Sequence, residues 1–202
     1  GWTVLSVRYR GTDEAAFPTP LTDVKTAIRW AKAHSSELGI DADSIVVAGF
    51  SAGGHLAALF GTSQSYGEPT AVPDSVRNVT TRPAAVIAID SVLDPATFPL
   101  AGGLGTSNAT AVNALLGCST PIAQWQRCNT ALLAATRVAR YADVSDPAMY
   151  VAAGDHDGIV NLAYQAAQPV AALTSALGDS KVWFDQIDTG NAAQYGGSDP
   201  RN

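Results

Sequence analysis

Short apolar runs alternate with amphipathic stretches along the whole chain. The runs are rich in small and β-branched residues and carry little polar alternation, which is typical of strands buried in a parallel sheet. The expected strands are Trp2–Arg8, Ile45–Ala48, Pro83–Asp90, Pro147–Ala153 and Lys181–Ile187. Between them the apolar spacing predicts helices. This alternation predicts an α/β fold, a mainly parallel sheet with helices on both faces.

Three longer helices are expected between these strands. Thr22 is a candidate N-cap for the first and Gly39 its end, while Pro169 should kink or divide the last. The expected spans are Asp23–Leu38, Asn129–Arg140 and Leu162–Leu177.

The segment Ser91–Asp143 shows the least regular pattern, and its portion Gly102–Asn108 is glycine-rich, polar and expected to be mobile. An insertion at this point of an α/β protein usually covers the carboxyl ends of the strands, so we expect 91–143 to shape a pocket. Asp188–Asn202 is a polar tail with no regular pattern. Without repeats or linkers, residues 1–202 are expected to form a single domain.

Composition narrows the function classes. The chain has 202 residues, 47% of them apolar, and a formal net charge of −6, which argues against a nucleic-acid partner or an anionic membrane surface. No apolar run is long enough for a membrane span. Cys118 and Cys128 favour a short disulfide loop slightly over the alternative of two free thiols. The composition favours a secreted or extracytoplasmic protein, with a cytoplasmic one as the alternative.

The strongest chemical signal is Gly49-Phe50-Ser51-Ala52-Gly53, which follows an apolar strand and precedes an Ala- and Leu-rich helix. Strand, Gly-x-Ser-x-Gly and helix is the context of a nucleophile elbow. The sharp turn strains Ser51, raises its hydroxyl above the sheet and frees the Ala52 N–H for an oxyanion. The alternative is a simple Gly/Ser turn in which Ser51 only caps the helix.

These features resemble the α/β-hydrolase superfamily, and within it the carboxylesterase branch that includes hormone-sensitive-lipase-like and feruloyl or acetylxylan esterases. The resemblance is carried by Val7–Arg10, Gly49–Ala58 and the stretch from Val144 to Val160. It covers Gly1 to about Asp188 and is weakest in 91–143. It implies a serine nucleophile whose partners follow in the order Ser, Asp, His.

The catalytic acid is expected in the turn after Pro147–Ala153. Asp157 is the favoured candidate because Gly154, Asp157 and Val160 fit the Gly-x-x-Asp-x-x-Val spacing that the resemblance implies. Asp155 competes with it in the same turn. The alternative is that both aspartates only form turns by bonding their own backbone.

The catalytic base is the missing part. No histidine follows the last strand, and His34, His55 and His156 are each expected to have other roles. The glycine-rich oxyanion loop of the family would precede Trp2. The chain therefore looks like a hydrolase fragment, incomplete at both ends, that alone should turn over esters weakly or not at all.

The leading hypothesis is a serine hydrolase that cleaves small-molecule carboxylic esters through an acyl-enzyme on Ser51. Two rivals are a catalytically inactive binding module and a serine peptidase of the same fold. No zinc-ligand spacing and no phosphate-binding glycine loop are found, so neither a metal nor another cofactor is expected. The pattern does not specify an oligomeric state.

Overall fold

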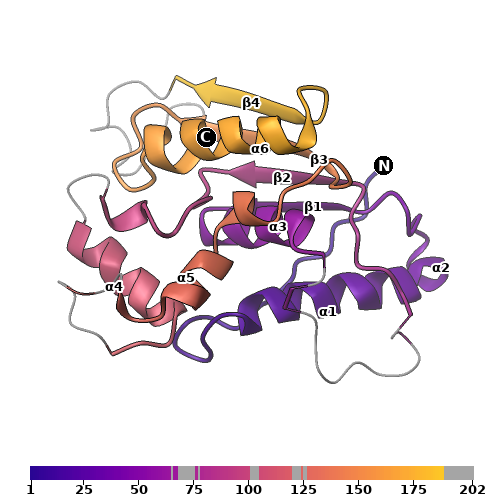
Figure 1. Ribbon diagram of the computed structural model, residues 1–202. Coiled ribbons are helices and arrows are strands. Elements are labelled where there is room, and N and C mark those ends of the chain that lie inside the picture. Colours follow the sequence, from indigo (N-terminus) through magenta and orange to yellow (C-terminus); the bar gives the residue numbers. More distant parts are fainter. Residues whose placement is uncertain are drawn as a thin grey trace.

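The computed structural model describes residues 1–64, 66–67, 76, 78–100, 105–119, 124 and 127–188. Its centre is a parallel sheet in the order β1-β2-β3-β4 (Figure 1). The strands are β1 (Val46–Phe50), β2 (Ala85–Ile89), β3 (Ala148–Gly154) and β4 (Val182–Ile187). Because the strands are parallel, all their carboxyl ends lie at one edge of the sheet.

Helices connect the strands and cover the sheet. The α-helices are α1 (Thr19–Ala33), α2 (Ser35–Leu38), α3 (Ala52–Thr62), α4 (Gly105–Leu115), α5 (Thr130–Ala135) and α6 (Gln168–Leu177). Shorter turns are η2 (Phe98–Leu100), η4 (Val138–Arg140) and the π-helical η5 (Ala163–Ala167). None of the described helices is long and apolar enough to cross a membrane.

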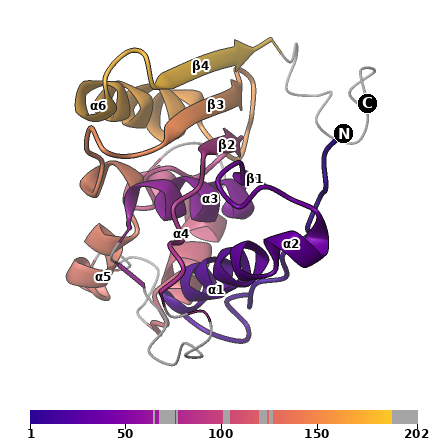
Figure 2. The same ribbon diagram turned by 90° about the vertical axis from the view of Figure 1, so that its right-hand side faces the viewer.

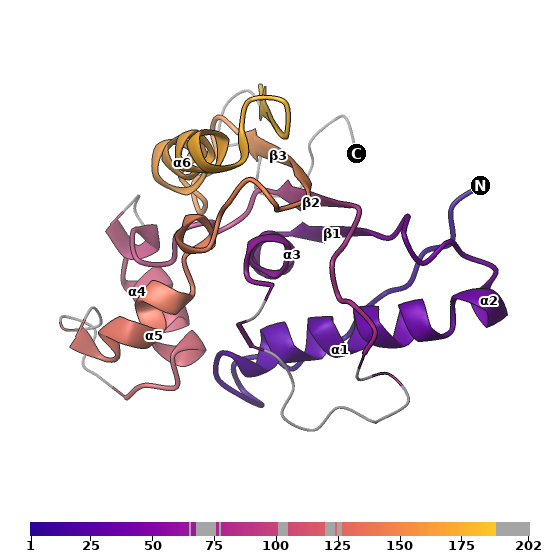
Figure 3. The same cartoon turned by 45° about the vertical axis from the view of Figure 1, so that its right-hand side comes forward.

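The main core lies between the sheet and the helices α1, α3 and α6. Val47, Val86 and Met149 face this core from three adjacent strands. The opposite face carries exposed apolar side chains, with Phe50 at 65% and Trp183 at 53% exposure. The parallel α/β fold predicted from the pattern is confirmed. The sequence pattern predicted helices on both faces, but in the described part these three helices lie on one face, as Figures 2 and 3 show.

The expected strand Trp2–Arg8 is not formed. This segment is not assigned to any strand, and Trp2 is 83% exposed. In the described part of the chain the sheet has four strands with β1 at one edge, and Trp2–Arg8 does not pair with that edge. The apolar pattern alone could not reveal that a partner strand was needed.

Helix boundaries depart from the sequence prediction at three places. α1 begins at Thr19 with Pro20 in its first turn, so Thr22 lies inside the helix and donates from Oγ1 to the Gly67 carbonyl instead of capping. α4 begins at Gly105, so the described part of the portion expected to be mobile, residues 105–108, is helical, and residues 102–104 lie outside the described part. The expected helix Asn129–Arg140 is shorter: Asn129 caps α5 with its side chain, and η4 follows.

One other expectation is confirmed, and one open alternative is resolved. Pro169 lies in the first turn of α6, at the point where the π-helical η5 ends, so the predicted division of the helix is seen there. Cys118 and Cys128 form a disulfide with Cα atoms 6.0 Å apart, linking the end of α4 to the start of α5. The last residues of the tail, 189–202, lie outside the described part.

Candidate active site

The turn from β1 into α3 has the geometry of a nucleophile elbow. Ser51 adopts φ 52° and ψ −120°, a conformation that L-residues rarely adopt. Its N–H donates to the Ile89 carbonyl at 2.9 Å, and its carbonyl accepts the His55 N–H at 3.0 Å. Ser51 is thus held between β2 and the first turn of α3, at the carboxyl edge of the sheet. Ala52 is the first residue of α3, where backbone N–H groups have no helical acceptor.

Tight packing beneath Ser51 requires glycine at two nearby positions, and only one of them, Gly49, belongs to the Gly-x-Ser-x-Gly motif. A Cβ on Gly49 would overlap the Gly53 carbonyl group and lie 2.6 Å from the Gly54 nitrogen. A Cβ on Gly54 would overlap the side chain of Ser91, which follows β2. A Cβ on Gly53 would meet only the Tyr9 hydroxyl at 3.8 Å, an ordinary contact. Gly49 and Gly54 are therefore the sterically required positions.

Acidic residues follow each of the next three strands at the same edge. Asp90 follows β2, Asp155 and Asp157 follow β3, and Asp188 follows β4. The backbone ladder continues past the strand ends, because the Asp90 N–H donates to Ala152 and the Asp155 N–H donates to Ile187. Ser51 and these carboxylates are thus gathered along one edge, which is where ligands bind in open parallel sheets.

The turn after β3, residues 155–160 and called the acid loop below, is built around Asp157. Its Oδ1 accepts the N–H groups of Ile159 at 2.7 Å and Val160 at 3.0 Å. Val160 is buried in a second apolar cluster with residues of α4 and α5. The acid loop is therefore fixed both to itself and to the segment 91–143, which the sequence predicted to shape the pocket.

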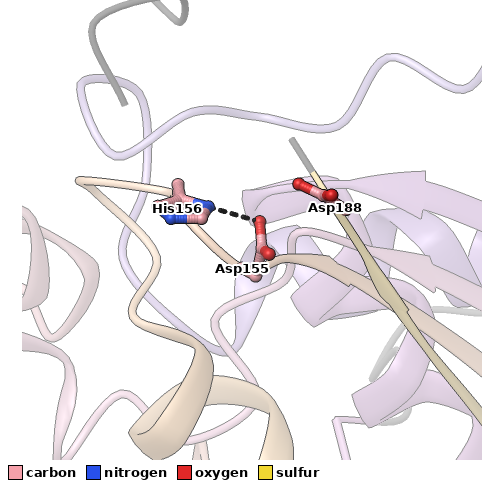
Figure 4. Close-up of side chains that lie close together, drawn as sticks. All are labelled: Asp155, His156 and Asp188. Atoms are coloured by element: carbon pink, nitrogen blue, oxygen red, sulfur yellow. Dashed lines mark hydrogen bonds and ion pairs between the residues drawn. The ribbon is translucent and has the colours of Figure 1, made fainter. Parts of the chain in front are cut away.

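Asp155 is engaged differently from Asp157. His156 Nδ1–H donates to Asp155 Oδ1 at 2.7 Å, and Asp188 lies beside this pair (Figure 4). Ligand atoms of the three residues lie within 4.8 Å of one another, so they form the group of described residues that could hold a metal ion. Exposed acidic groups often gather without a metal, and the chain offers no further observation of one here.

The three histidines bond groups other than Ser51. His34 Nδ1–H donates to the Trp30 carbonyl at 2.8 Å. His55 is buried and donates from Nε2 to the Thr136 carbonyl at 2.7 Å, and burial lowers the pKa of its imidazole. His156 is held by Asp155 in the acid loop.

Asp90 is the site residue that the sequence reasoning missed. Its backbone has φ 42°, and in the described part of the chain only Ser51 shares a positive φ among non-glycine residues. Its Oδ1 accepts the Gly154 N–H at 2.8 Å. Burial raises the pKa of Asp90 above its ordinary value, the Gly154 bond lowers it, and the nearby Asp157 carboxylate raises it. An aspartate at the end of a strand was the only signal available.

A buried polar network joins the segment 91–143 to η5, which follows the acid loop in the chain. Gln165 is fully buried in η5; it accepts the Asp94 N–H and donates to the Asp94 carbonyl, both at 3.1 Å. The Asp94 carboxylate accepts from Arg137 Nε at 3.1 Å and Nη2 at 2.8 Å. Thr136, next to Arg137, bonds His55 of α3. Segments distant in sequence are thereby fixed relative to the elbow.

A cavity of about 300 Å³ lies away from this site. Ala84 and Pro147, which precede β2 and β3, help line it, together with Lys32 and Arg82. It therefore opens at the amino ends of the strands, opposite Ser51. Its position gives no information about the chemistry at the elbow.

A family model described as BD-FAE matches residues 1–170, the part of the chain that contains the elbow and the acid loop. The chain belongs to the BD-FAE family. It is therefore a member of the carboxylesterase branch of the α/β-hydrolase superfamily, as the residues of the elbow indicated. The match includes Ser51, Asp90 and Asp157.

Relatives named as esterases match about a third of the chain. Esterase LipC from Mycobacterium tuberculosis is 51% identical over 61 residues, which are 30% of this chain and 15% of LipC. An arylesterase from Saccharolobus solfataricus is 52% identical over 56 residues, 28% of this chain and 18% of that protein. These matches span less than a fifth of each curated relative.

Solved structures match over nearly the whole chain. A truncated carbohydrate esterase from gut microbiota has a TM-score of 0.71 at 23% identity, covering 93% of this chain and 66% of its own. An acetyl ester-xyloside bifunctional hydrolase from Caldicellulosiruptor lactoaceticus has a TM-score of 0.68 at 26% identity, covering 94% and 63%. The first likeness shows the fold, and the second agrees with the family assignment.

Proposed function

We propose that this chain carries the nucleophile of a carboxylic-ester hydrolase, with Ser51 forming the acyl-enzyme. The observation that carries the proposal is the strained conformation of Ser51 between β1 and α3. A conformation that costs on the order of 1–3 kcal/mol persists where the surrounding structure enforces it, and such strain gathers at active sites. Relatives named as esterases match about a third of the chain, which supports ester substrates.

In the proposed mechanism Ser51 Oγ attacks the ester carbonyl while a histidine base takes its proton. The C–O bond to the alcohol then breaks, the histidine returns the proton to the leaving alcohol, and water hydrolyses the acyl-enzyme to the free acid. The Ala52 N–H donates to the oxyanion, because the first N–H groups of a helix are available to a ligand and lie at the positive end of its dipole. Asp157 orients and stabilises the histidine. Asp155, whose carboxylate accepts a hydrogen bond from His156, is the alternative acid.

The base is assigned to none of the three histidines of this chain. We propose that the 202 residues alone hydrolyse esters weakly or not at all, since a serine without a base is a poor nucleophile. Efficient Ser51-dependent hydrolysis by this chain alone would contradict that proposal. The segment 91–143 is proposed to shape the pocket, because its helices pack against Val160 of the acid loop. The disulfide favours a secreted or extracytoplasmic location.

The test compares the full-length gene product with its Ser51→Ala and Asp157→Asn variants on p-nitrophenyl acetate. We expect Ser51→Ala to abolish measurable turnover and Asp157→Asn to lower kcat by about 10³- to 10⁴-fold. Asp155→Asn is the matched control and should retain most of the activity. A larger loss in Asp155→Asn than in Asp157→Asn would exchange the two assignments. Full activity in Ser51→Ala would refute the proposed nucleophile.

A further inference from the structure

The carboxyl end of β2 has an unusual hydrogen-bond arrangement. The Asp90 N–H continues the parallel ladder by donating to the Ala152 carbonyl at 2.9 Å. In a regular continuation, the Gly154 N–H would then donate to the backbone carbonyl of Asp90. The neighbouring strand pair shows this pattern, because there the Asp155 N–H donates to the Ile187 carbonyl at 3.1 Å.

At Asp90 the side chain takes the place of the backbone carbonyl. The backbone turns into the left-handed region, with φ 42°, and Oδ1 accepts the Gly154 N–H at 2.8 Å. Aspartate and asparagine tolerate this conformation better than most residues. The position therefore calls for two properties together: tolerance of a positive φ and a short side chain with an acceptor oxygen.

Both halves of the proposed site are attached to this point of β2. The Ser51 N–H bonds the carbonyl of Ile89, and the Gly154 N–H bonds the side chain of Asp90, the next residue. Gly154 is the last residue of β3 and directly precedes the acid loop. Two consecutive residues, Ile89 and Asp90, thus connect Ser51 to the start of the acid loop through hydrogen bonds. Reacting groups must be placed to within about 1 Å, because a misplacement of that size can cost on the order of a hundredfold in rate.

We propose that Asp90 is a positioning residue for the reaction at Ser51: its carboxylate fixes the point at which the chain leaves β3 and so sets the acid loop relative to the nucleophile. This inference rests on the proposed function. Asp90 touches neither the substrate nor the reacting atoms in this role. It acts through Gly154 and the acid loop.

Three substitutions separate the two properties of Asp90. Asp90→Asn keeps both the acceptor oxygen and the tolerance of a positive φ. Asp90→Gly keeps the backbone conformation without strain but removes the acceptor. Asp90→Ala removes both. Each variant is made in the full-length gene product, and its reactive serine is titrated with a fluorophosphonate. The kcat is then calculated per titrated serine, so a smaller fraction of folded protein does not lower the measured kcat.

We expect Asp90→Asn to retain kcat within about threefold of the unmodified protein. Asp90→Gly should lose about tenfold or more in kcat at unchanged KM, since one hydrogen bond that fixes the acid loop is missing. Asp90→Ala should lose at least as much and also unfold at a lower temperature. Unchanged kcat per titrated serine in Asp90→Gly overturns the proposal, and so does an equal loss in Asp90→Asn.

A second measurement follows the bond itself. The Gly154 amide hydrogen should exchange slowly with solvent in the unmodified protein and in Asp90→Asn, and about tenfold faster or more in Asp90→Gly. Equal protection in all three proteins also overturns the proposal. If the unmodified protein neither titrates nor hydrolyses esters, the proposed function fails and the positioning role fails with it. If it does both, failure of the variants to differ refutes the role of Asp90 alone.

Discussion

The packing under the elbow makes a sharp prediction about two glycines of the same motif. Gly49→Ala places a Cβ against the Gly53 carbonyl group and 2.6 Å from the Gly54 nitrogen, and both are backbone atoms that cannot rotate away. Overpacking of this kind usually costs about 1–3 kcal/mol, and a clash with backbone belongs at the upper end. For a chain of this length, 3 kcal/mol corresponds to a fall of about 6–12 °C in Tm.

Gly53→Ala is the matched control. Its Cβ would lie 3.8 Å from the Tyr9 hydroxyl, and alanine in a helix is favoured over glycine by up to about 1 kcal/mol. We expect its Tm to equal or exceed that of the unmodified chain. Thermal unfolding followed by circular dichroism measures both variants. The steric reasoning is refuted if Gly49→Ala unfolds within about 2 °C of the unmodified chain, or if both variants lose equal stability.

Three further predictions concern stability. Gln165→Met should lower the free energy of unfolding, measured by chemical denaturation, by about 2–4 kcal/mol, because buried backbone groups of Asp94 lose their partners. The exposed control Gln168→Met should lower it by less than about 0.5 kcal/mol, and equal losses would contradict this prediction. Burial raises the pKa of Asp146 to about 6, so its ionisation destabilises the fold as pH rises from about 4 to 6. Asp146→Asn should therefore be more stable by about 1 kcal/mol at pH 8 and not at pH 4, and a pH-independent difference would refute this. Reduction of the Cys118–Cys128 disulfide should lower the free energy of unfolding by about 2–3 kcal/mol, so Tm should fall when a phosphine reductant is added. The Tm of a variant with both cysteines replaced by serine should not change with the reductant.

The elbow could be predicted from sequence because its determinants are local. A strand, a serine between glycines and a helix occupy one continuous stretch, and the structure places them as expected, with Ser51 at φ 52°. The alternation of strands and helices likewise predicted the parallel sheet. The motif does not reveal the steric requirement, because Gly54, which lies outside it, must be glycine and Gly53 need not be.

What could not be predicted depends on contacts between distant residues. Trp2–Arg8 has the composition of a strand, but a strand forms only where another backbone can pair with it. Gln165 and Asp94 are 71 residues apart, and nothing in either local sequence signals their bonds. Asp90 looks like any polar residue that ends a strand. Its left-handed backbone follows from the positions of β2, β3 and the acid loop together.

The central claim is that Ser51 is an activated nucleophile. The most direct measurement is to treat the full-length gene product with a fluorophosphonate, digest it and locate the adduct by mass spectrometry. We predict one adduct, on Ser51, formed with loss of esterase activity and absent from heat-unfolded protein. An active protein labelled at another serine, or active protein that leaves Ser51 unlabelled while its activity persists, would contradict the account.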